Sequence, residues 1–253
     1  MILSTATAPS RGPVAGLAAQ VVLLLALNVT VGLTAAGWAA GLAYALVLWM
    51  TLTAGLQAAG MRMLGPANGV TLARASLVAG VTALVVTSIS RPVPTAVLVA
   101  LIGVALALDG VDGQVARRTG SASTLGARFD MEVDAFLILV LSVFVGSMLG
   151  WWTVAIGAFR YVFAAASRAL PWLAVPLPPR FSRKVVAAVQ GVVLVVATAQ
   201  LLPPALAYAA VLAALASLTW SFGRDIAWLC RRERAARRAA LPVLPVVRHP
   251  VPA

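Results

Sequence analysis

Residues 109–134 read DGVDGQVARRTGSASTLGARFDMEVD and carry five of the seven carboxylates in this chain of 253 residues. Strongly apolar segments flank the stretch, LIGVALAL at 101–108 and AFLILVLSVFVG at 135–146. Acids are costly near a bilayer core, so a cluster of them beside apolar helices indicates a functional site. This acidic stretch is therefore the expected functional centre of the protein.

The spacing of the acids fits two helices. Asp109 and Asp112 are three residues apart, and Asp130 and Asp134 are four apart, so each pair shares one helix face. The segment GSASTLG at 120–126 separates the two predicted helices. If these helices run antiparallel, they direct all four aspartates to a shared point.

Four carboxylates that close repel one another and need cations between them. No Cys or His lies nearby, so oxygen-preferring Mg²⁺ or Mn²⁺ is favoured over zinc. Gly113 leaves space for a ligand to approach the backbone, and Arg117 is suited to a phosphate. Acids, metal ions and an arginine together indicate phosphoryl-transfer chemistry.

The same residues resemble a known family signature. The matching positions, in order, are Asp109, Asp112, Gly113, Ala116, Arg117, Gly126, Asp130 and Asp134. Their order and spacing are similar to the signature of the CDP-alcohol phosphotransferase family, and the resemblance covers roughly residues 60–222. It implies an enzyme with a six-helix membrane core that releases CMP, and it also implies a homodimer.

The resemblance further implies roles for individual residues. The four aspartates would bind the metal ions that bridge the diphosphate, and Asp134 would also be the general base for the acceptor hydroxyl. Contacts to the CDP part would come from Asn68, Gly69, Val70, Thr71, Gly113, Arg117 and Ser123. Glu132 is outside the signature, and we expect it to pair with an arginine elsewhere.

Composition predicts an all-α integral membrane protein, because 62% of the residues are hydrophobic and only 10% are charged. The expected helices are about 14–33, 37–58, 70–90, 93–112, 124–148, 151–170, 184–202 and 204–222. We expect an N-terminal transmembrane hairpin (1–58), a core (59–222) and a basic cytoplasmic tail (223–253). Gly37 and Gly41 form a small-xxx-small pair suited to close helix packing.

The positive charges predict the orientation of the chain in a cell membrane. With eight spans, one side holds nearly all of the arginines and lysines, and the other side holds only Arg91. By the positive-inside rule both termini and the acidic cluster are cytoplasmic. A cleaved secretory signal is the alternative for the N-terminus, but no clear cleavage site follows the first apolar run.

Residues 61–74, MRMLGPANGVTLAR, predict a loop that enters a helix, with Asn68 as its cap. A helix start of this kind favours an anion. The segment is similar to the Pro-Asn-x-x-Thr-x-x-Arg entry of the family, which contributes to the nucleotide pocket. A plain capped helix is the alternative interpretation.

Basic residues that follow the acidic stretch 109–134 indicate what kind of alcohol acceptor the protein uses. Arg160 lies within an apolar helix and needs an anionic partner, either Glu132 or a phosphate on the acceptor. Arg183 and Lys184 begin the following helix beside Arg180, and Lys184 with Gln190 resembles a Lys-x5-Gln pattern of family members that use phosphorylated acceptors. Val186 replaces the family's second lysine. We expect a phosphorylated polyol, although positive-inside anchoring explains part of this cluster.

The tail begins as a basic amphipathic helix that favours anionic lipid over nucleic acid. Cys230 and His249 are the only residues of their types, which excludes a disulfide and a Ser-His-Asp triad.

The expected reaction is transfer of a phosphatidyl group from CDP-diacylglycerol to an alcohol in phospholipid biosynthesis. An intramembrane Mg²⁺-dependent prenyltransferase is the first alternative, and a divalent-cation transporter is the second.

Overall fold

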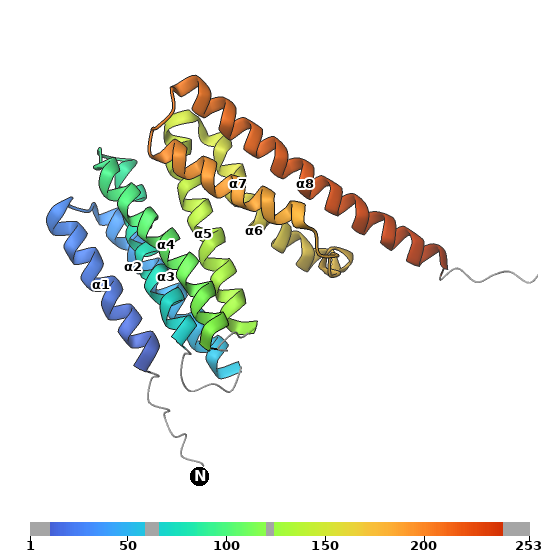
Figure 1. The fold of residues 1–253 in the computed structure, drawn as a ribbon, viewed down its shortest axis with the longest axis horizontal. Helices are drawn as coiled ribbons and strands as arrows, with labels where there is room; N and C mark the ends of the chain where they lie inside the picture. Colours follow the sequence, from blue (N-terminus) through green and yellow to red (C-terminus); the bar gives the residue numbers. More distant parts are fainter. Residues whose placement is uncertain (1–10, 59–65, 120–123, 240–253) are drawn as a thin grey trace, which may run out of the picture.

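The computed structural model describes residues 11–58, 66–119 and 124–239, which form eight α-helices, two short 3₁₀-helices and no strand. The eight predicted helices are confirmed within these residues (Figure 1). The elements are α1 Arg11–Thr30, α2 Ala35–Ala58, α3 Pro66–Ser88, α4 Thr95–Thr119, α5 Thr124–Leu149, η1 Trp151–Thr153, α6 Val154–Ala169, η2 Pro171–Ala174, α7 Phe181–Thr198 and α8 Pro204–Ala239.

Proline begins two of the helices and glycine follows the end of another, as expected from their backbone chemistry. Pro66 and Pro204 occupy the first positions of α3 and α8, where the missing N–H leaves no hydrogen bond unmade. Gly32, at φ 72°, follows α1, and its N–H donates to the Leu27 carbonyl at 3.1 Å. Two helices end later in the sequence than predicted. Helix α4 continues past residue 112 to Thr119, and α8 continues past residue 222 to Ala239.

Five helices in the described ranges are long and apolar enough to cross a bilayer, so the chain is a multi-pass membrane protein. The candidate spans are Ala35–Ala58, Gly69–Ser88, Leu125–Leu149, Phe181–Thr198 and Pro204–Arg238. Gly16–Thr30 and Thr95–Val111 are shorter apolar helices. The two hairpin turns α1–α2 and α3–α4 lie at the end of the bundle opposite the acid-bearing ends of α4 and α5 (Figure 1).

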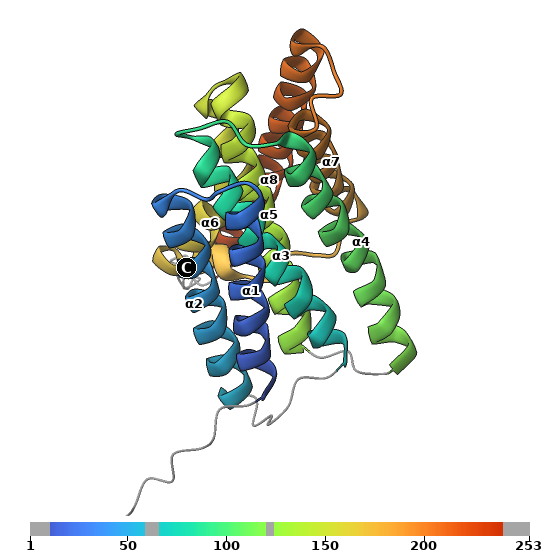
Figure 2. The same cartoon turned by 90° about the vertical axis from the view of Figure 1, so that its left-hand side faces the viewer.

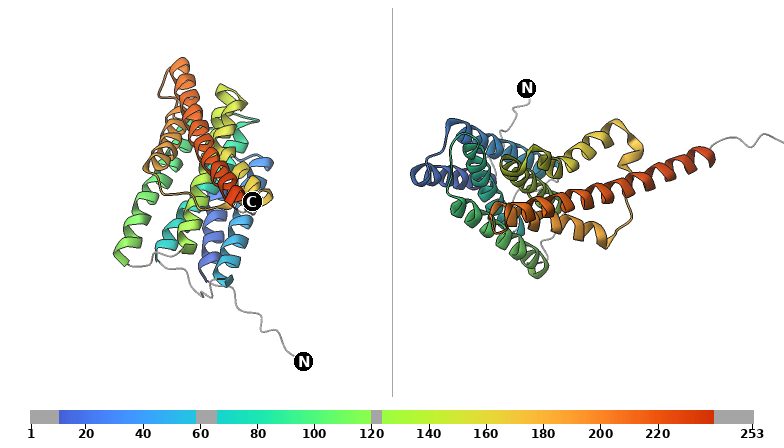
Figure 3. Two further views of the ribbon diagram at one scale, coloured as in Figure 1. Left: turned by 90° about the vertical axis from the view of Figure 1, so that its right-hand side faces the viewer. Right: turned by 90° about the horizontal axis from the view of Figure 1, so that it is seen from above.

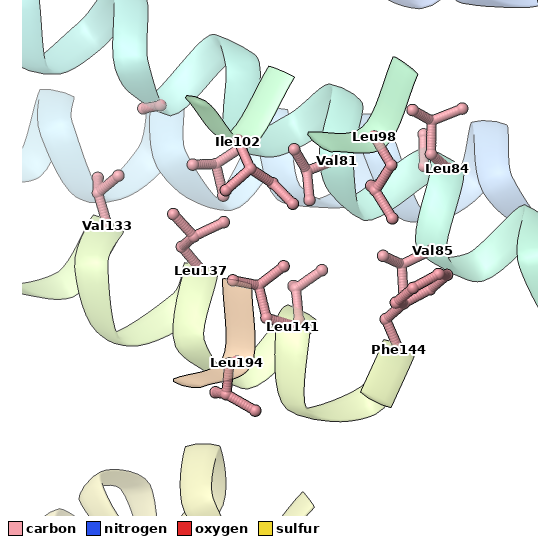
Figure 4. Close-up of a cluster of buried hydrophobic side chains, with 14 of the residues drawn as sticks. Val81, Leu84, Val85, Leu98, Ile102, Val133, Leu137, Leu141, Phe144 and Leu194 are labelled. Atoms are coloured by element: carbon pink, nitrogen blue, oxygen red, sulfur yellow. The ribbon is translucent and has the colours of Figure 1, made fainter. Parts of the chain in front are cut away.

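Helix α3 is the centre of the bundle. It packs against α1, α2, α4 and α5, and Ala75, Val78 and Val81 on it have no exposed surface. Figure 4 shows side chains from α3, α4, α5 and α7 meeting in one apolar cluster. The labelled members are Val81, Leu84, Val85, Leu98, Ile102, Val133, Leu137, Leu141, Phe144 and Leu194.

The α1–α2 hairpin lies along one side of the bundle against α3 (Figure 2). Gly37 makes the closest approach, since a Cβ there would lie 2.7 Å from the Ala83 carbonyl oxygen and 2.2 Å from Thr87 Oγ1. The predicted packing role of the Gly37–Gly41 pair is therefore confirmed. Arg91 secures the turn of the hairpin by donating to the Val31 carbonyl at 2.6 Å.

Helix α8 reaches well beyond the other helices (Figure 3). Its first half packs on α7, and its second half carries the basic residues of the tail. The expected core-to-tail boundary at residue 222 therefore falls inside one continuous helix. Buried Asp225, 7% exposed, lies just after that boundary and forms an ion pair with Arg183 of α7 at 3.4 Å.

Candidate active site

Three of the four predicted aspartates converge. Asp109 comes from α4, and Asp130 and Asp134 come from α5. One carboxylate oxygen from each lies within 4.8 Å of the others. Their side chains are 42%, 36% and 48% exposed, so the cluster is open on one side. Asp112 lies one helical turn after Asp109 in α4, but its side chain is outside the described part of the structure.

A single arginine holds this cluster together. Arg74 of α3 is 1% exposed, and its Nη1 and Nη2 donate to Asp109 and Asp130 respectively. Nη1 also lies 3.1 Å from Asp134 Oδ1, and Nη2 lies 3.4 Å from the Asp130 carbonyl oxygen. The planar guanidinium suits this task, because it presents several donors in fixed directions.

The route by which the acids meet differs from the prediction. We expected α4 and α5 to form an antiparallel pair that points its acids inward. Instead α3 packs along both helices, and the described parts of α4 and α5 have little backbone contact with each other. The acids reach a common point because α3 presents Arg74 between the two helices.

The cluster retains negative charge after this pairing. Three ionised carboxylates and one guanidinium leave two negative charges, and two carboxylates about 4 Å apart repel by about 4 kcal/mol at an effective dielectric constant of 20. The donors are oxygens only, with no Cys or His in the described group. Mg²⁺ and Mn²⁺ prefer such donors, and opposite ligands of Mg²⁺ lie about 4.2 Å apart, close to the observed span. The residues therefore fit a divalent ion.

Residues 68–71, which are predicted to contact the nucleotide, lie on the first turns of α3, ahead of Arg74. Thr71, 2% exposed, is one turn before Arg74 on the same face of α3. Val70 is half-buried, and Gly69 is exposed with open space around its missing Cβ. Asn68 is the third residue of α3, so the prediction that it caps this helix is wrong.

The other predicted nucleotide contacts are less completely described. Gly113 and Arg117 belong to the last turns of α4, and nothing further is described for them. Ser123 lies outside the described residues. The helical stretch that carries Gly113 and Arg117 directly continues the turn that carries Asp109, which keeps these positions at the same end of the bundle.

The predicted acceptor residues do not form one group of free cations. Arg160 Nη2 donates to Glu132 Oε1 at 2.5 Å, which confirms the expected arginine partner of Glu132. Glu132 is two residues from Asp130, about 200° around α5. The pair therefore lies on the opposite side of α5 from the aspartates. Whether Arg160 also contacts an acceptor stays a prediction.

Helix α7 carries the remaining basic candidates. Arg183 forms the ion pair with Asp225 and also donates to the Pro178 carbonyl. Lys184 is exposed, with no ion pair or hydrogen bond to the described part of the chain. Gln190 is 2% exposed and donates to the Ala214 carbonyl at 3.0 Å, so its amide joins α7 to α8.

Arg74 is the site residue that sequence reasoning missed. In the sequence Arg74 is the arginine that ends the Pro-Asn-x-x-Thr-x-x-Arg stretch and one of the predicted cytoplasmic positive charges, and neither feature predicts its contact with the acids. A signal was present, because Arg74 is the single cation within the apolar helix 66–88, and a cation there requires anionic partners. The only concentrated source of such partners in this sequence is the acidic stretch 109–134.

Comparison with protein families gives one assignment. The sequence model described as CDP-alcohol phosphatidyltransferase matches residues 64–220, well over half of the chain. The matched region begins just before α3 and ends within α8, so it includes Arg74 and all four predicted aspartates. Comparison with curated proteins and with solved structures found no match in either set.

Proposed function

Since the chain belongs to the CDP-alcohol phosphatidyltransferase family, we propose that it transfers a phosphatidyl group from CDP-diacylglycerol to an alcohol acceptor. The single observation that carries this proposal is the convergence of Asp109, Asp130 and Asp134 around Arg74 in a multi-pass membrane protein. Acid clusters of this kind suit a diphosphate bound through divalent ions.

The proposed donor site lies between the acid cluster and the first turns of α3. The four aspartates would hold Mg²⁺ or Mn²⁺, and a bound ion would neutralise the diphosphate and the charge that develops on it. Residues 68–71, Gly113, Arg117 and Ser123 would contact the CDP part. Exposed Gly69 supports this arrangement, because a ligand can approach the backbone there without meeting a side chain.

Asp134 is the proposed general base. It would accept the proton of the acceptor hydroxyl as the hydroxyl oxygen forms a bond to the phosphorus that carries the lipid alcohol. The bond from that phosphorus to the bridging oxygen breaks, and CMP leaves with the electron pair. Asp134 has the most exposed side chain of the three aspartates, 48%, and the longest contact with Arg74, which supports its choice as the residue that receives a proton.

The proposed acceptor is a phosphorylated polyol such as glycerol phosphate or inositol phosphate. Lys184 supports this choice, because it is an exposed cation on the first turn of α7. Arg183 supports it less strongly, since Asp225 already neutralises part of its charge. Arg160 is a candidate only if an acceptor phosphate displaces Glu132 from it.

The proposed setting is a cell membrane with both termini and the site on the cytoplasmic side, and with the protein as a homodimer. Arg91 at the turn end of the bundle and the many basic residues at the opposite end support this orientation. The basic second half of α8 would then face the anionic inner leaflet.

The test uses the purified full-length protein in lipid vesicles with radiolabelled CDP-diacylglycerol and a panel of alcohols. We expect release of CMP and a labelled phospholipid, with Mg²⁺ or Mn²⁺ required and EDTA inhibitory. Asp134→Asn is the inactive variant, and Glu132→Gln, which removes a charge from the same helix outside the cluster, is its matched control. Pyrophosphate release from a prenyl diphosphate, with no CMP from any acceptor, would overturn the proposal.

A further inference from the structure

An apolar groove of about 680 Å³ runs between α2 and α5 and is separate from the acid cluster. Val47 of α2 and Phe136 of α5 contribute to its apolar lining, and Tyr161 of α6 closes one edge. Val47 is 53% exposed, so the groove opens to the outside of the bundle. In a membrane protein this outside is lipid.

Two contacts between α2 and α5 mark the groove, one at the edge of its lining and one within it. Towards the loop ends of the helices, Gly55 of α2 meets Leu125 of α5, since a Cβ at Gly55 would lie 2.7 Å from Leu125 Cδ1. Further along, the rings of Tyr44 and Phe136 stack with their centroids 4.6 Å apart. The backbones of α2 and α5 otherwise diverge, which leaves the space between them.

The groove has the length of one lipid leaflet. Its lining on α2 runs from Ala40 to Leu52, which corresponds to roughly 18 Å of helix. Half of the hydrocarbon core of a bilayer is about 15 Å thick. The groove is therefore long enough for one extended acyl chain.

One end of the groove attracts an anion. Arg128 lines it near the start of α5, and its side chain is exposed and makes no hydrogen bond or ion pair with the described residues. Glu132 also lines this end, but its charge is already paired with Arg160. Arg128 lies four residues after the start of α5, about 6 Å along the helix, and a basic residue near the end of a membrane-spanning helix attracts anionic lipid headgroups.

The groove does not face the reacting groups. Arg128 is two residues before Asp130, so the two side chains point about 200° apart around α5. A molecule whose phosphate lies beside Arg128 is thus on the other side of α5 from the acids. This separates the occupant of the groove from the nucleotide-linked donor.

We propose that this groove binds one acyl chain of an anionic glycerophospholipid from the surrounding membrane, with the lipid phosphate beside Arg128. Helix α2 forms one whole wall of this site, and α2 lies outside the family match at residues 64–220. The α1–α2 hairpin therefore adds a structural lipid site to the family core.

The experiment uses the full-length protein in phosphatidylcholine vesicles that contain a phosphatidylglycerol with a diazirine on its acyl chain. After irradiation, mass spectrometry of the digested protein identifies the labelled peptides. We expect adducts on the groove-lining parts of α2 and α5. A phosphatidylcholine probe with the same acyl diazirine measures labelling that does not depend on the headgroup charge.

Two variants and their controls decide the result. Arg128→Gln is expected to lower the preference for the anionic probe about fivefold, the effect typical of one arginine at an anionic lipid surface. Val47→Trp is expected to fill the groove and reduce labelling by both probes. Arg234→Gln, an exposed tail arginine, and Val22→Trp, a 65% exposed position on α1, are the matched controls and should change neither.

Three outcomes would overturn the proposal. The first is labelling that is spread evenly over exposed helices with no enrichment in the groove. The second is an unchanged headgroup preference in Arg128→Gln. The third is protection of the groove by a second copy of the chain, seen as a dimer by native mass spectrometry that Val47→Trp dissociates while groove labelling rises.

Discussion

The first prediction concerns Arg74, because its removal leaves the negative charges of three carboxylates without their shared positive partner. In Arg74→Met the side-chain volume is roughly kept, while the donors to Asp109 and Asp130 and the ion pair with Asp134 are lost. We expect a less stable protein whose stability depends more strongly on divalent ions, since a bound ion can replace part of the lost positive charge.

The contacts of Arg74 give the expected loss of unfolding free energy. Two charge-assisted hydrogen bonds contribute about 1.5–3 kcal/mol each. The carboxylates are 36–48% exposed, so solvent screening reduces the sum, and we expect a loss of about 3 kcal/mol without metal. For a chain of this size that corresponds to a melting temperature roughly 6–12 °C lower.

The assay is thermal unfolding in detergent at a fixed scan rate, in EDTA and in Mg²⁺. The difference between the two conditions should be larger for Arg74→Met than for the unchanged protein. Arg91→Met is the matched control, because Arg91 donates one exposed hydrogen bond to Val31, and we expect a loss of at most about 1 kcal/mol. If Arg74→Met melts like the control in EDTA, the counter-charge role of Arg74 is refuted.

Three further predictions concern the chemistry and the packing. Asp134→Asn should lower CMP release by a factor of about 100 or more while CDP-diacylglycerol binding persists; activity equal to that of the unchanged protein would remove Asp134 from the role of base. Arg160→Ala, which breaks an exposed pair with Glu132, should change stability by less than about 1 kcal/mol and raise the KM for the acceptor more than the KM for the donor; equal effects on the two KM values would leave Arg160 with a structural role only. Gly157→Ala should destabilise the protein by about 1–3 kcal/mol, because its Cβ would lie 2.3 Å from Leu139 Cα, whereas Gly103→Ala, which meets nothing within 4 Å, should be neutral in the same unfolding assay.

Much of the fold followed from local patterns in the sequence. Apolar runs of membrane-spanning length predicted eight helices, because a helix in lipid must be long and must satisfy its own backbone. Spacings of three and four residues placed Asp109, Asp130 and Asp134 on particular helix faces. The Gly37–Gly41 pair predicted a close helix contact, which the structure locates against α3.

The sequence alone also determined which counter-ions suit the acid cluster, because carboxylates without Cys or His favour hard cations. It determined the helix faces as well, since the periodicity of a helix depends only on neighbouring residues. It did not determine which helix each face meets. Helix ends were least certain, as α8 shows, because apolar and basic residues both tolerate a continuous helix.

Only the tertiary structure decided which charged residues pair with one another. Arg74 reaches Asp109 and Asp130 across 35 and 56 residues of chain, and no local pattern specifies such a pairing. The same holds for Arg160, which had two possible partners in the sequence and meets Glu132 across 28 residues. The groove between α2 and α5 likewise exists only because two helices far apart in the sequence diverge in space. The physical reason is that side-chain direction follows from local helix geometry, whereas proximity follows from the packing of the whole bundle around α3.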